Sequence, residues 1–318
     1  MTSLIIMNIL IVGTGALASL FAARLTQAGH DITMLGTWRE GLDALNQDGV
    51  RFVDADGNEA SYPVRATDDP RECVDVKLAI VLVKAWQTER IATQLSTCLA
   101  KDGLALTLQN GLGNKETFIQ SLGLTRVALG STTTGATLLG PGHVKAGGEG
   151  VISLEQNQAL GPMEEALLSA GFNIQIVEDA NALIWGKLVI NAAINPLTAL
   201  LRVKNGELLE RPSAREMMGT LAIETANVAR AENIQLPFDD PVKIAEDVAR
   251  KTAANTSSML QDVLRGAPTE VDAINGEVIK AANKAGVPVP VNRILRYLVK
   301  SIVKSNSTRY TYANYTNI

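Results

Sequence analysis

Three polar side chains interrupt an apolar run in the second half of the sequence. The segment KLVINAAIN places Lys187, Asn191 and Asn195 four residues apart within an apolar run from Leu183 to Leu201. In an α-helix this spacing puts the three side chains on one face. A cation on an otherwise apolar helix is costly unless a ligand or partner meets it, so the stripe predicts a polar binding surface. The alternative is a lysine that reaches solvent from a half-exposed helix.

The chemistry that suits such a stripe is the reduction of a ketone. Hydride addition puts negative charge on the ketone oxygen, and a nearby ammonium group stabilises that charge and donates a proton. Amide side chains can fix the hydroxyl and carbonyl groups of a small substrate. Because the chain has only two histidines, Lys187 is the candidate acid.

A glycine turn near the start of the chain predicts where a nucleotide cofactor binds. The turn GTGALA consists of Gly13, Thr14, Gly15, Ala16, Leu17 and Ala18. It follows a buried strand predicted over residues 5–12 and opens a helix predicted over 16–28, which is the context of the dinucleotide-binding fingerprint. Gly13 permits the tight turn, Gly15 lets the backbone approach the pyrophosphate, and the first N–H groups of the helix meet the phosphates. The alternative is a glycine turn without a ligand.

Arg39 bears on the choice between NADP and NAD. An NAD site has an acidic residue at the end of the second strand, on the ribose hydroxyls. Here the strand predicted over 31–35 is followed by Gly36, Thr37, Trp38 and Arg39. The lack of an acid and the closeness of Arg39 to the expected 2′-phosphate favour NADP (NADPH). The adjacent Glu40, and the alternative of a solvated surface arginine, leave the choice open.

The elements that must position these residues fall into two halves. In the first half, apolar runs alternate with helical segments, which predicts an α/β fold with a Rossmann-type, doubly wound parallel sheet. We predict strands over residues 5–12, 31–35, 78–83, 104–108, 127–129, 150–154 and 173–177. The second half is helical, with helices predicted over 181–201, 214–232, 241–263 and 269–285. Pro196 should kink or end the first of these helices.

The change of pattern sets the expected domain boundary. We expect an NADP-binding Rossmann domain over residues 1–178 and an all-helical substrate-binding domain over residues 179–318. The glycine-rich stretch from Thr132 to Val177 is interpreted as the closing edge of the first domain. The polar, Tyr-rich tail over 305–318 is expected to be loosely held.

The bulk composition restricts the function classes. The chain has 318 residues, 46% hydrophobic and 19% charged content and a net charge of −4, so we expect a globular protein without general affinity for nucleic acid or membrane. The apolar opening is too short to span a bilayer and has no basic residues ahead of it, so we expect no signal peptide and a cytoplasmic protein. Met7 is an alternative start to Met1. Cys73 and Cys98 have no metal or redox spacing and are expected in the core, and no metal site is predicted.

Further motifs make the sequence resemble the ketopantoate reductases (2-dehydropantoate 2-reductases) over nearly its whole length. In order they are the GTGALA turn, VLVKAWQT around Lys84, QNGLG around Asn110, STTTGA ending at Ala136, KLVINAAINPLTALL, NGE at 205–207, SSMLQD and TEVDAINGEV. The resemblance implies a Rossmann domain followed by a helical domain, with the active site in the cleft between them. It also implies that a small 2-oxo acid, 2-dehydropantoate, is reduced to (R)-pantoate with NADPH, a step towards pantothenate and coenzyme A.

The resemblance implies roles for individual residues. Lys187 matches the family's general acid, and Glu270 matches the acid that meets substrate hydroxyls or the cofactor. The matches to substrate ligands are Asn191, Asn195, Asn205 and Ser258. The matches to cofactor contacts near the ribose and nicotinamide are Lys84, Asn110 and Ala136. Without the family, Lys84 is equally a solvated loop lysine, Asn110 part of a tight turn, Ser258 a surface residue and Glu270 a first-turn helix acid.

Two rival functions remain. One is a reductase of the same fold that acts on another small 2-oxo or imino acid. The other is a non-catalytic NADP-binding regulator, which would keep the glycine turn but would not need the lysine–amide stripe. The chain departs from the family at Gly36, where many members carry an arginine, so Arg39 or Thr37 would have to replace it. The oligomeric state is not fixed by the sequence, and a homodimer is compatible with the helical second half.

Overall fold

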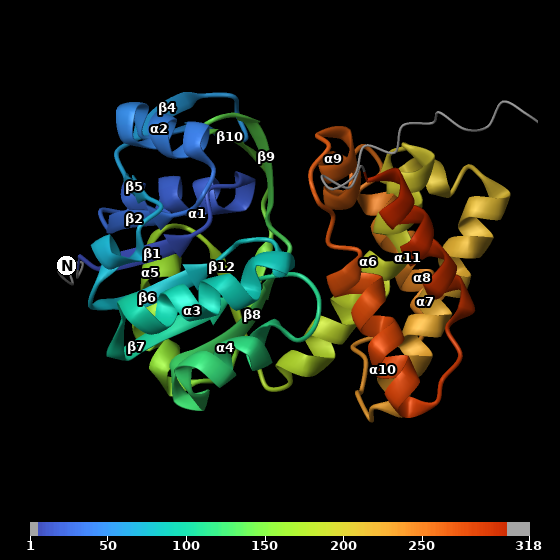
Figure 1. The fold of residues 1–318 in the computed structure, drawn as a ribbon. Helices are drawn as coiled ribbons and strands as arrows, with labels where there is room; N and C mark the ends of the chain where they lie inside the picture. The colour runs from blue at the N-terminus through green and yellow to red at the C-terminus, as the bar shows by residue number, and fades with distance from the viewer. Residues whose placement is uncertain (1–5, 304–318) are drawn as a thin grey trace, which may run out of the picture. The chain divides into compact units, whose positions relative to one another are not determined.

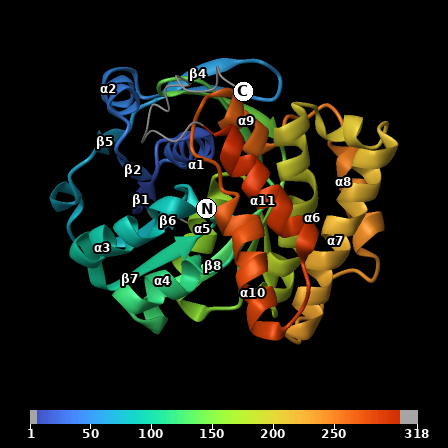
Figure 2. The ribbon, with the colours of Figure 1, turned by 45° about the vertical axis from the view of Figure 1, so that its right-hand side comes forward.

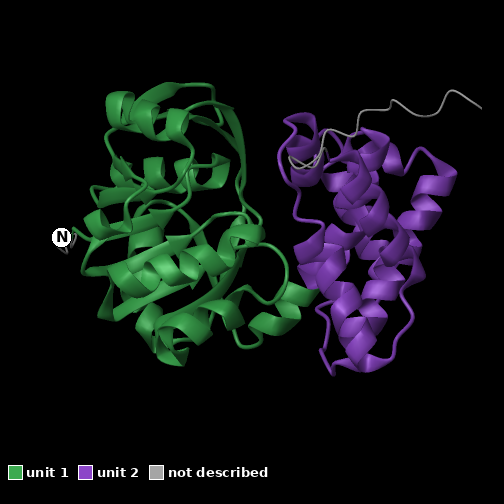
Figure 3. Ribbon diagram, viewed as in Figure 1, with its two compact units in different colours: residues 1–185 green, residues 186–318 purple. Residues whose placement is uncertain are grey.

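The chain forms two compact units, residues 1–185 and 186–318, in the computed structural model, which describes residues 6–303 (Figure 3). The first residue of the strand predicted from residue 5 and the Tyr-rich tail lie outside the described residues. Unit 1 is built from strands and helices and unit 2 from helices alone, within the described residues, which confirms the predicted fold class.

The main sheet of unit 1 has eight strands in the order β12-β11-β8-β7-β6-β1-β2-β5 (Figure 1). Its strands are β1 (Asn8–Val12), β2 (Asp31–Leu35), β5 (Arg65–Thr67), β6 (Val76–Val81), β7 (Leu99–Thr107), β8 (Val127–Thr132), β11 (Val151–Glu155) and β12 (Asn173–Val177). The six neighbouring strands β8-β7-β6-β1-β2-β5 are all parallel to one another, whereas β11 runs antiparallel to β8. The strand order reverses beside β1, as in other doubly wound sheets that bind ligands at such a point.

The carboxyl ends of the four central strands are level with one another. Val12 of β1 pairs with Leu35 of β2 and with Val81 of β6, and Val81 pairs with Thr107 of β7. The loops that follow these strands therefore start side by side on one edge of the sheet, where open α/β sheets bind their ligands.

A second sheet of four strands completes unit 1 and was not predicted. Its order is β4-β3-β10-β9, from β3 (Val50–Val53), β4 (Glu59–Tyr62), β9 (Gly135–Gly140) and β10 (His143–Gly148). Helix α1 (Ala16–Gln27) contacts β3, β9 and β10 as well as β1 and β2, so it is held between the two sheets. The other helices of unit 1 are α2 (Arg39–Asp48), α3 (Thr88–Cys98), α4 (Asn114–Leu122) and α5 (Gly161–Ser169), with 3-10 turns η1 (Pro70–Cys73), η2 (Ala85–Gln87), η3 (Leu124–Arg126) and η4 (Gln158–Leu160).

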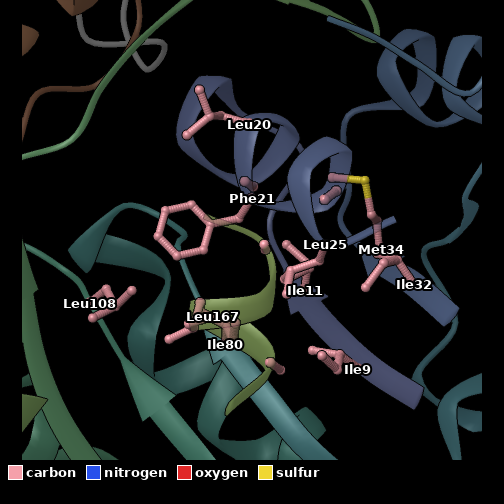
Figure 4. Packing of buried hydrophobic residues seen from close by; sticks show 14 of the residues in the cluster. Ile9, Ile11, Leu20, Phe21, Leu25, Ile32, Met34, Ile80, Leu108 and Leu167 are labelled. Atoms are coloured by element: carbon pink, nitrogen blue, oxygen red, sulfur yellow. The ribbon is translucent and has the colours of Figure 1, made fainter. Parts of the chain in front are cut away.

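Alternating side chains of β1 fill two separate hydrophobic clusters. Ile9 and Ile11 belong to the cluster that contains Phe21 and Leu25 of α1, shown in Figure 4. Leu10 and Val12 belong to the opposite cluster, with residues of α3 and α4 such as Phe118. Both faces of the parallel sheet are therefore covered at β1, which explains why residues 9–12 are continuously apolar in sequence. Cys73 and Cys98 are free and buried in the second cluster, as predicted.

Unit 2 consists of helices that follow one another through short turns (Figure 2). They are α6 (Ala180–Leu201), η5 (Asn205–Leu208), α7 (Pro212–Ala231), α8 (Pro241–Lys251), α9 (Ser258–Leu264), the π-helical turn η6 (Asp272–Gly276), α10 (Glu277–Ala285) and α11 (Pro290–Ile302). By length and composition α6 would be able to cross a membrane, but 72% of its most apolar stretch is buried inside the structure, as in the core helix of a globular unit. Val189, Ala193 and Leu197 of α6 pack into the same cluster as residues of α7.

One predicted helix of unit 2 is interrupted. The helix predicted over 241–263 stops at Lys251 and restarts at Ser258 as α9. In the intervening turn, the carbonyls of Ala253 and Asn255 accept hydrogen bonds from the backbone N–H groups of Gly206 and Asn205. These contacts with η5 replace intrahelical bonds, so tertiary structure overrides the local helical pattern.

The helix predicted over 181–201 does not end at Pro196, and the helix predicted over 269–285 begins at Asp272 with a π-helical turn. Proline removes one N–H from the helix interior and leaves a carbonyl unpaired, which is why Pro196 was expected to kink or end the helix. The structure supplies a side-chain donor to that carbonyl instead, the amide of Asn275. Helix α11 was not predicted.

Candidate active site

The glycine turn has the geometry of a phosphate-binding loop. Gly13 has a φ of +131°, and a Cβ there would lie 3.3 Å from the Cβ of Ala18. This close approach explains why residue 18 is no larger than alanine. The N–H of Gly13 donates to the carbonyl of Leu35 at 2.8 Å, which ties the turn to β2. A Cβ on Gly15 would meet nothing within 4 Å, so the backbone there is open to a ligand.

The start of α1 offers hydrogen-bond donors to that open space. The helix begins at Ala16, and no side chain of a described residue caps it. The N–H groups of the first turn have no partner within the helix, and the positive end of the helix dipole lies beside them. Backbone and dipole together suit the pyrophosphate of a dinucleotide.

Two further predicted cofactor residues lie on the same edge of the sheet. Lys84 follows β6 and precedes η2, and Asn110 follows β7; both are half-buried. Since β6 and β7 are neighbours beside β1, the structure brings both loops to the edge that carries the glycine turn. Ala136 belongs to the other sheet, at the start of the strand that follows β8. It is on β9 of the second sheet, paired with Ala146, and β9 contacts α1.

The end of β2 explains one departure from the family pattern. A Cβ on Gly36 would lie 2.6 Å from the Cγ2 of Thr14, so the threonine of the glycine turn occupies the space that a side chain would need. Arg39 begins α2, and its side chain is 76% exposed and ion-paired with Asp43 at 3.3 Å. The structure therefore places Arg39 at the surface, one helical turn from a competing acid.

A buried polar network that was not predicted connects the loops of Lys84 and Asn110. Gln109 is 6% exposed, and its Nε2 donates to the carbonyl of Val83 at 3.1 Å and to the Oγ1 of Thr88 at 2.9 Å. The Oγ1 of Thr88 lies 2.8 Å from the Oδ1 of Asn114, whose Nδ2 donates to the carbonyl of Asn110 at 3.0 Å. The sequence signal was a glutamine at the end of an apolar strand, immediately before the predicted cofactor residue.

In unit 2, Lys187 and Glu270 act on one another electrostatically. Burial lowers the pKa of Lys187 to about 8, and the negative charge of Glu270 opposes that shift. Glu270 is only 5% exposed, so its carboxylate needs a positive or hydrogen-bonding partner in the interior. The structure thus brings together the two residues predicted to be catalytic, although they are far apart in the sequence.

The amides of the stripe lie on the same helix as Lys187. Asn191 is half-buried and Asn195 is 7% exposed. Gly186, immediately before Lys187, lies where a Cβ would be 2.9 Å from the Cγ of Pro237, so α6 packs closely against the loop before α8 at this point. The close packing fixes the start of the polar stripe.

Asn205 and Ser258 lie on other elements of unit 2. The Nδ2 of Asn205 donates to the Oγ1 of Thr252 at 2.9 Å, while its buried Oδ1 has no partner among the described residues. Ser258 is exposed at the first position of α9. Its neighbour Ser257, which was not predicted, caps α9 and lies 2.7 Å from the Oγ1 of Thr198 on α6. Ser257 therefore joins α9 to the helix of the stripe and leaves Ser258 outward.

Among residues 6–303, no three His, Cys, Asp or Glu side chains cluster as metal ligands. The predicted site residues of unit 2 supply an ammonium, a carboxylate, several amides and a hydroxyl. Such a set can donate a proton and hold oxygen atoms.

Comparisons with known proteins agree over most of the chain. The family model "Ketopantoate reductase PanE/ApbA" matches residues 9–159, and its C-terminal counterpart matches residues 179–303. A 2-dehydropantoate 2-reductase of Archaeoglobus fulgidus is 37% identical over 302 residues, which cover 93% of this chain and 98% of the relative. One of Halobacterium salinarum is 32% identical over 299 residues, covering 92% and 98%.

Two solved structures have closely similar folds. A PanE/ApbA family ketopantoate reductase from Ralstonia eutropha JMP134 superposes with a TM-score of 0.87 at 29% identity, covering 93% of this chain and 98% of that one. The ternary structure of D-mandelate dehydrogenase with NADH and anilino(oxo)acetate superposes with a TM-score of 0.88 at 27% identity, with the same coverage.

Proposed function

The chain belongs to the ketopantoate reductase family, and on that premise we propose that it reduces 2-dehydropantoate to (R)-pantoate with NADPH. The observation that carries the proposal is the interaction of the half-buried Lys187 with the buried Glu270, beside the amide stripe of α6. A protein that only sensed a nucleotide would gain nothing from a partly desolvated lysine in unit 2. We assign the reaction to the cytoplasm, where free thiols such as those of Cys73 and Cys98 stay reduced.

In the proposed reaction, Lys187 is the proton donor. When bound, the reduced nicotinamide supplies the hydride that adds to the ketone carbon. The electron pair of the carbonyl π bond moves to the oxygen, which takes a proton from the Nζ of Lys187. With a pKa of about 8, the lysine is mostly protonated at neutral pH and yet gives up its proton readily. The neutral amine then regains a proton from water.

The remaining polar residues of unit 2 hold the substrate in this proposal. Asn191 and Asn195 lie one and two helical turns from Lys187 on the same face of α6. Their amides fix the carbonyl and hydroxyl groups, and Glu270 accepts a hydrogen bond from a substrate hydroxyl. The exposed hydroxyl of Ser258 and the unpaired Oδ1 of Asn205 supply further contacts to the carboxylate and hydroxyl ends.

The nucleotide is assigned to the glycine-turn edge of unit 1. The open backbone at Gly15 and the level ends of β1, β2, β6 and β7 fit a dinucleotide. We assign NADPH over NADH because no acid stands directly after β2, at residues 36–38, and because Arg39 can exchange Asp43 for a 2′-phosphate. The solved structure of D-mandelate dehydrogenase is a complex with NADH, so NADH is the competing nucleotide in the test below.

The test is a comparison of substrates and nucleotides with purified protein. NADPH absorbance is followed with ketopantoate and, separately, with benzoylformate, the 2-oxo acid that corresponds to mandelate. We expect a higher kcat/KM for ketopantoate, and a higher kcat/KM for NADPH than for NADH that is lost in Arg39→Ala. A preference for benzoylformate would show that the substrate assignment is wrong. NADPH binding without turnover of either acid would favour a regulator.

A further inference from the structure

Helix α6 continues through Pro196, and the consequence falls on Ala192. In an α-helix the N–H of residue 196 would donate to the carbonyl of residue 192, and proline has no N–H. Ala192 is fully buried, so water does not reach its carbonyl either. A buried carbonyl without a donor is costly, so the helix can run through this proline only if another group supplies the bond.

Asn275 supplies the missing donor. Its Nδ2 lies 3.2 Å from the carbonyl oxygen of Ala192 and 2.9 Å from the Oδ1 of Asn292. The Asn275 side chain is fully buried, and its own Oδ1 has no partner among the described residues. The amide is therefore oriented for the two bonds that it donates, at the expense of the one that it would accept.

The bond to Asn292 anchors Asn275 to two more helices. The Nδ2 of Asn292 donates to Glu224 of α7 at 2.8 Å. The Glu224 carboxylate also accepts the backbone N–H groups of Val291 and Asn292, at 2.9 and 3.0 Å, in the first turn of α11. A chain of buried hydrogen bonds thus runs from α7 and α11 through Asn275 to α6, and such a network is stiff when its members are held.

Asn275 belongs to the segment that carries Glu270. It lies in the π-helical turn η6, and the N–H of Ile274 donates to the carbonyl of Glu270 at 2.9 Å. At the other end of its bond, Ala192 sits on α6 between Lys187 and Asn195. Single π-helical turns of this kind are frequent at functional sites, where they redirect a side chain.

We propose that Asn275 is a positioning residue. It holds Glu270 near Lys187 by docking the π-helical turn on the carbonyl of Ala192, which Pro196 leaves without an intrahelical donor. The proposal rests on the function proposed above for Lys187 and Glu270. Because Pro196 has no N–H, the carbonyl of Ala192 on α6 is left to accept a bond from elsewhere. The bond from Asn275 to this carbonyl fixes the position of the segment that carries Glu270 relative to α6. A purely structural role would require only that the carbonyl be satisfied, whereas positioning requires that the donor come from η6.

That difference defines the experiment. Asn275→Leu leaves the Ala192 carbonyl without a donor, and Pro196→Ala restores an intrahelical N–H to the same carbonyl. In Asn275→Leu we expect both Tm and kcat to fall. In Pro196→Ala/Asn275→Leu we expect Tm to recover in part, because the Oδ1 of Asn292 still lacks its donor, while kcat with ketopantoate stays about 10- to 100-fold below that of the wild type because the catalytic groups are misplaced. The Kd for NADPH should not change, and Pro196→Ala alone should retain both Tm and kcat.

Amide hydrogen exchange gives a second readout that does not depend on turnover. We expect residues 270–276 to exchange faster in the double variant than in the wild type, while the amides of α6 regain their protection. If Asn275→Leu alone does not fold, the double variant, in which the carbonyl is satisfied, carries both measurements. Recovery of kcat in the double variant, or wild-type exchange over 270–276, would show that Asn275 only satisfies the carbonyl. A wild-type protein inactive on ketopantoate would overturn the proposed function. The exchange result would still show whether Asn275 holds residues 270–276 in place.

Discussion

Replacing Glu270 by glutamine should move the alkaline limb of the pH–rate profile to lower pH. Burial lowers the pKa of Lys187, the charge of Glu270 raises it, and the balance is about 8. A nearby opposite charge shifts a pKa by about 1 to 3 units, so without Glu270 the pKa of Lys187 should fall below its value in the wild type. At a pH near 8 the protonated fraction would then fall from about one half to about one tenth or less.

The sign follows from the role of the lysine. A general acid works in its protonated form, so the rate declines as pH rises through its pKa. In Glu270→Gln this decline should begin at least about one pH unit earlier than in the wild type. The assay is kcat for ketopantoate reduction at saturating NADPH, measured from about pH 6 to about pH 10, a range chosen to bracket the expected pKa values.

Asp272→Asn is the matched control, since it removes the same charge two residues away. The Asp272 carboxylate bonds to Arg296 at 2.6 Å and to Lys300 at 2.9 Å and is half-exposed. We expect the alkaline limb of the pH–rate profile of Asp272→Asn to coincide with that of the wild type. A limb that does not move in Glu270→Gln, or that moves equally in Asp272→Asn, would refute the idea that Glu270 keeps Lys187 charged.

Three further changes test other parts of the molecule. Thr88→Val breaks the network between the loops of Lys84 and Asn110 and should raise the Kd for NADPH about tenfold by fluorescence titration, whereas Thr225→Val, the same change at a buried threonine of α7, should not. Gly36→Ala puts a Cβ 2.6 Å from the Thr14 Cγ2 and should cost about 1 to 3 kcal/mol in urea unfolding, and an added Thr14→Ala should recover part of that loss. Burial lowers the pKa of His30, so the unfolded chain takes up the proton first and stability should fall as pH drops below 6.5; a Tm that falls as steeply in His30→Gln would contradict this.

The central strands could be predicted because several consecutive residues in them are apolar, as burial on both faces requires. A parallel sheet covered on both faces favours unbroken apolar strands, and the runs at residues 9–12 in β1 and 78–81 in β6 meet that requirement. The glycine turn was recognisable for the same reason, since its small residues follow directly from local geometry. The stripe on α6 was visible because helical periodicity places side chains four residues apart on one face.

What was missed depends on partners that are distant in the sequence. The break between α8 and α9 exists because carbonyls there bond to η5, about fifty residues earlier in the chain. Helix α6 continues past Pro196 because Asn275, 83 residues from Ala192 in the sequence, donates to the freed carbonyl. The local sequence shows which backbone carbonyl loses its intrahelical donor. It does not show which distant side chain donates in place of that N–H.

The position of Gln109 illustrates a different limit. Its neighbour Asn110 was identified through a family motif, whereas Gln109 had no assigned role. Its partners, Val83 and Thr88, lie in the loop after the adjacent strand, and they become neighbours only once β6 and β7 pair. A polar residue at the end of a buried strand is a useful signal of such a network, since it must find partners there.

The most direct test of the account is the oxidation of NADPH by ketopantoate, followed with wild-type protein and with Lys187→Ala. We predict turnover by the wild type and a kcat lower by about 10²- to 10⁴-fold in the variant, because the proton donor is gone. NADPH should bind both proteins equally, since the proposed phosphate contacts of the glycine turn are unchanged in the variant. A Lys187→Ala protein that turns over ketopantoate at the wild-type rate would contradict the assignment of Lys187 as the general acid.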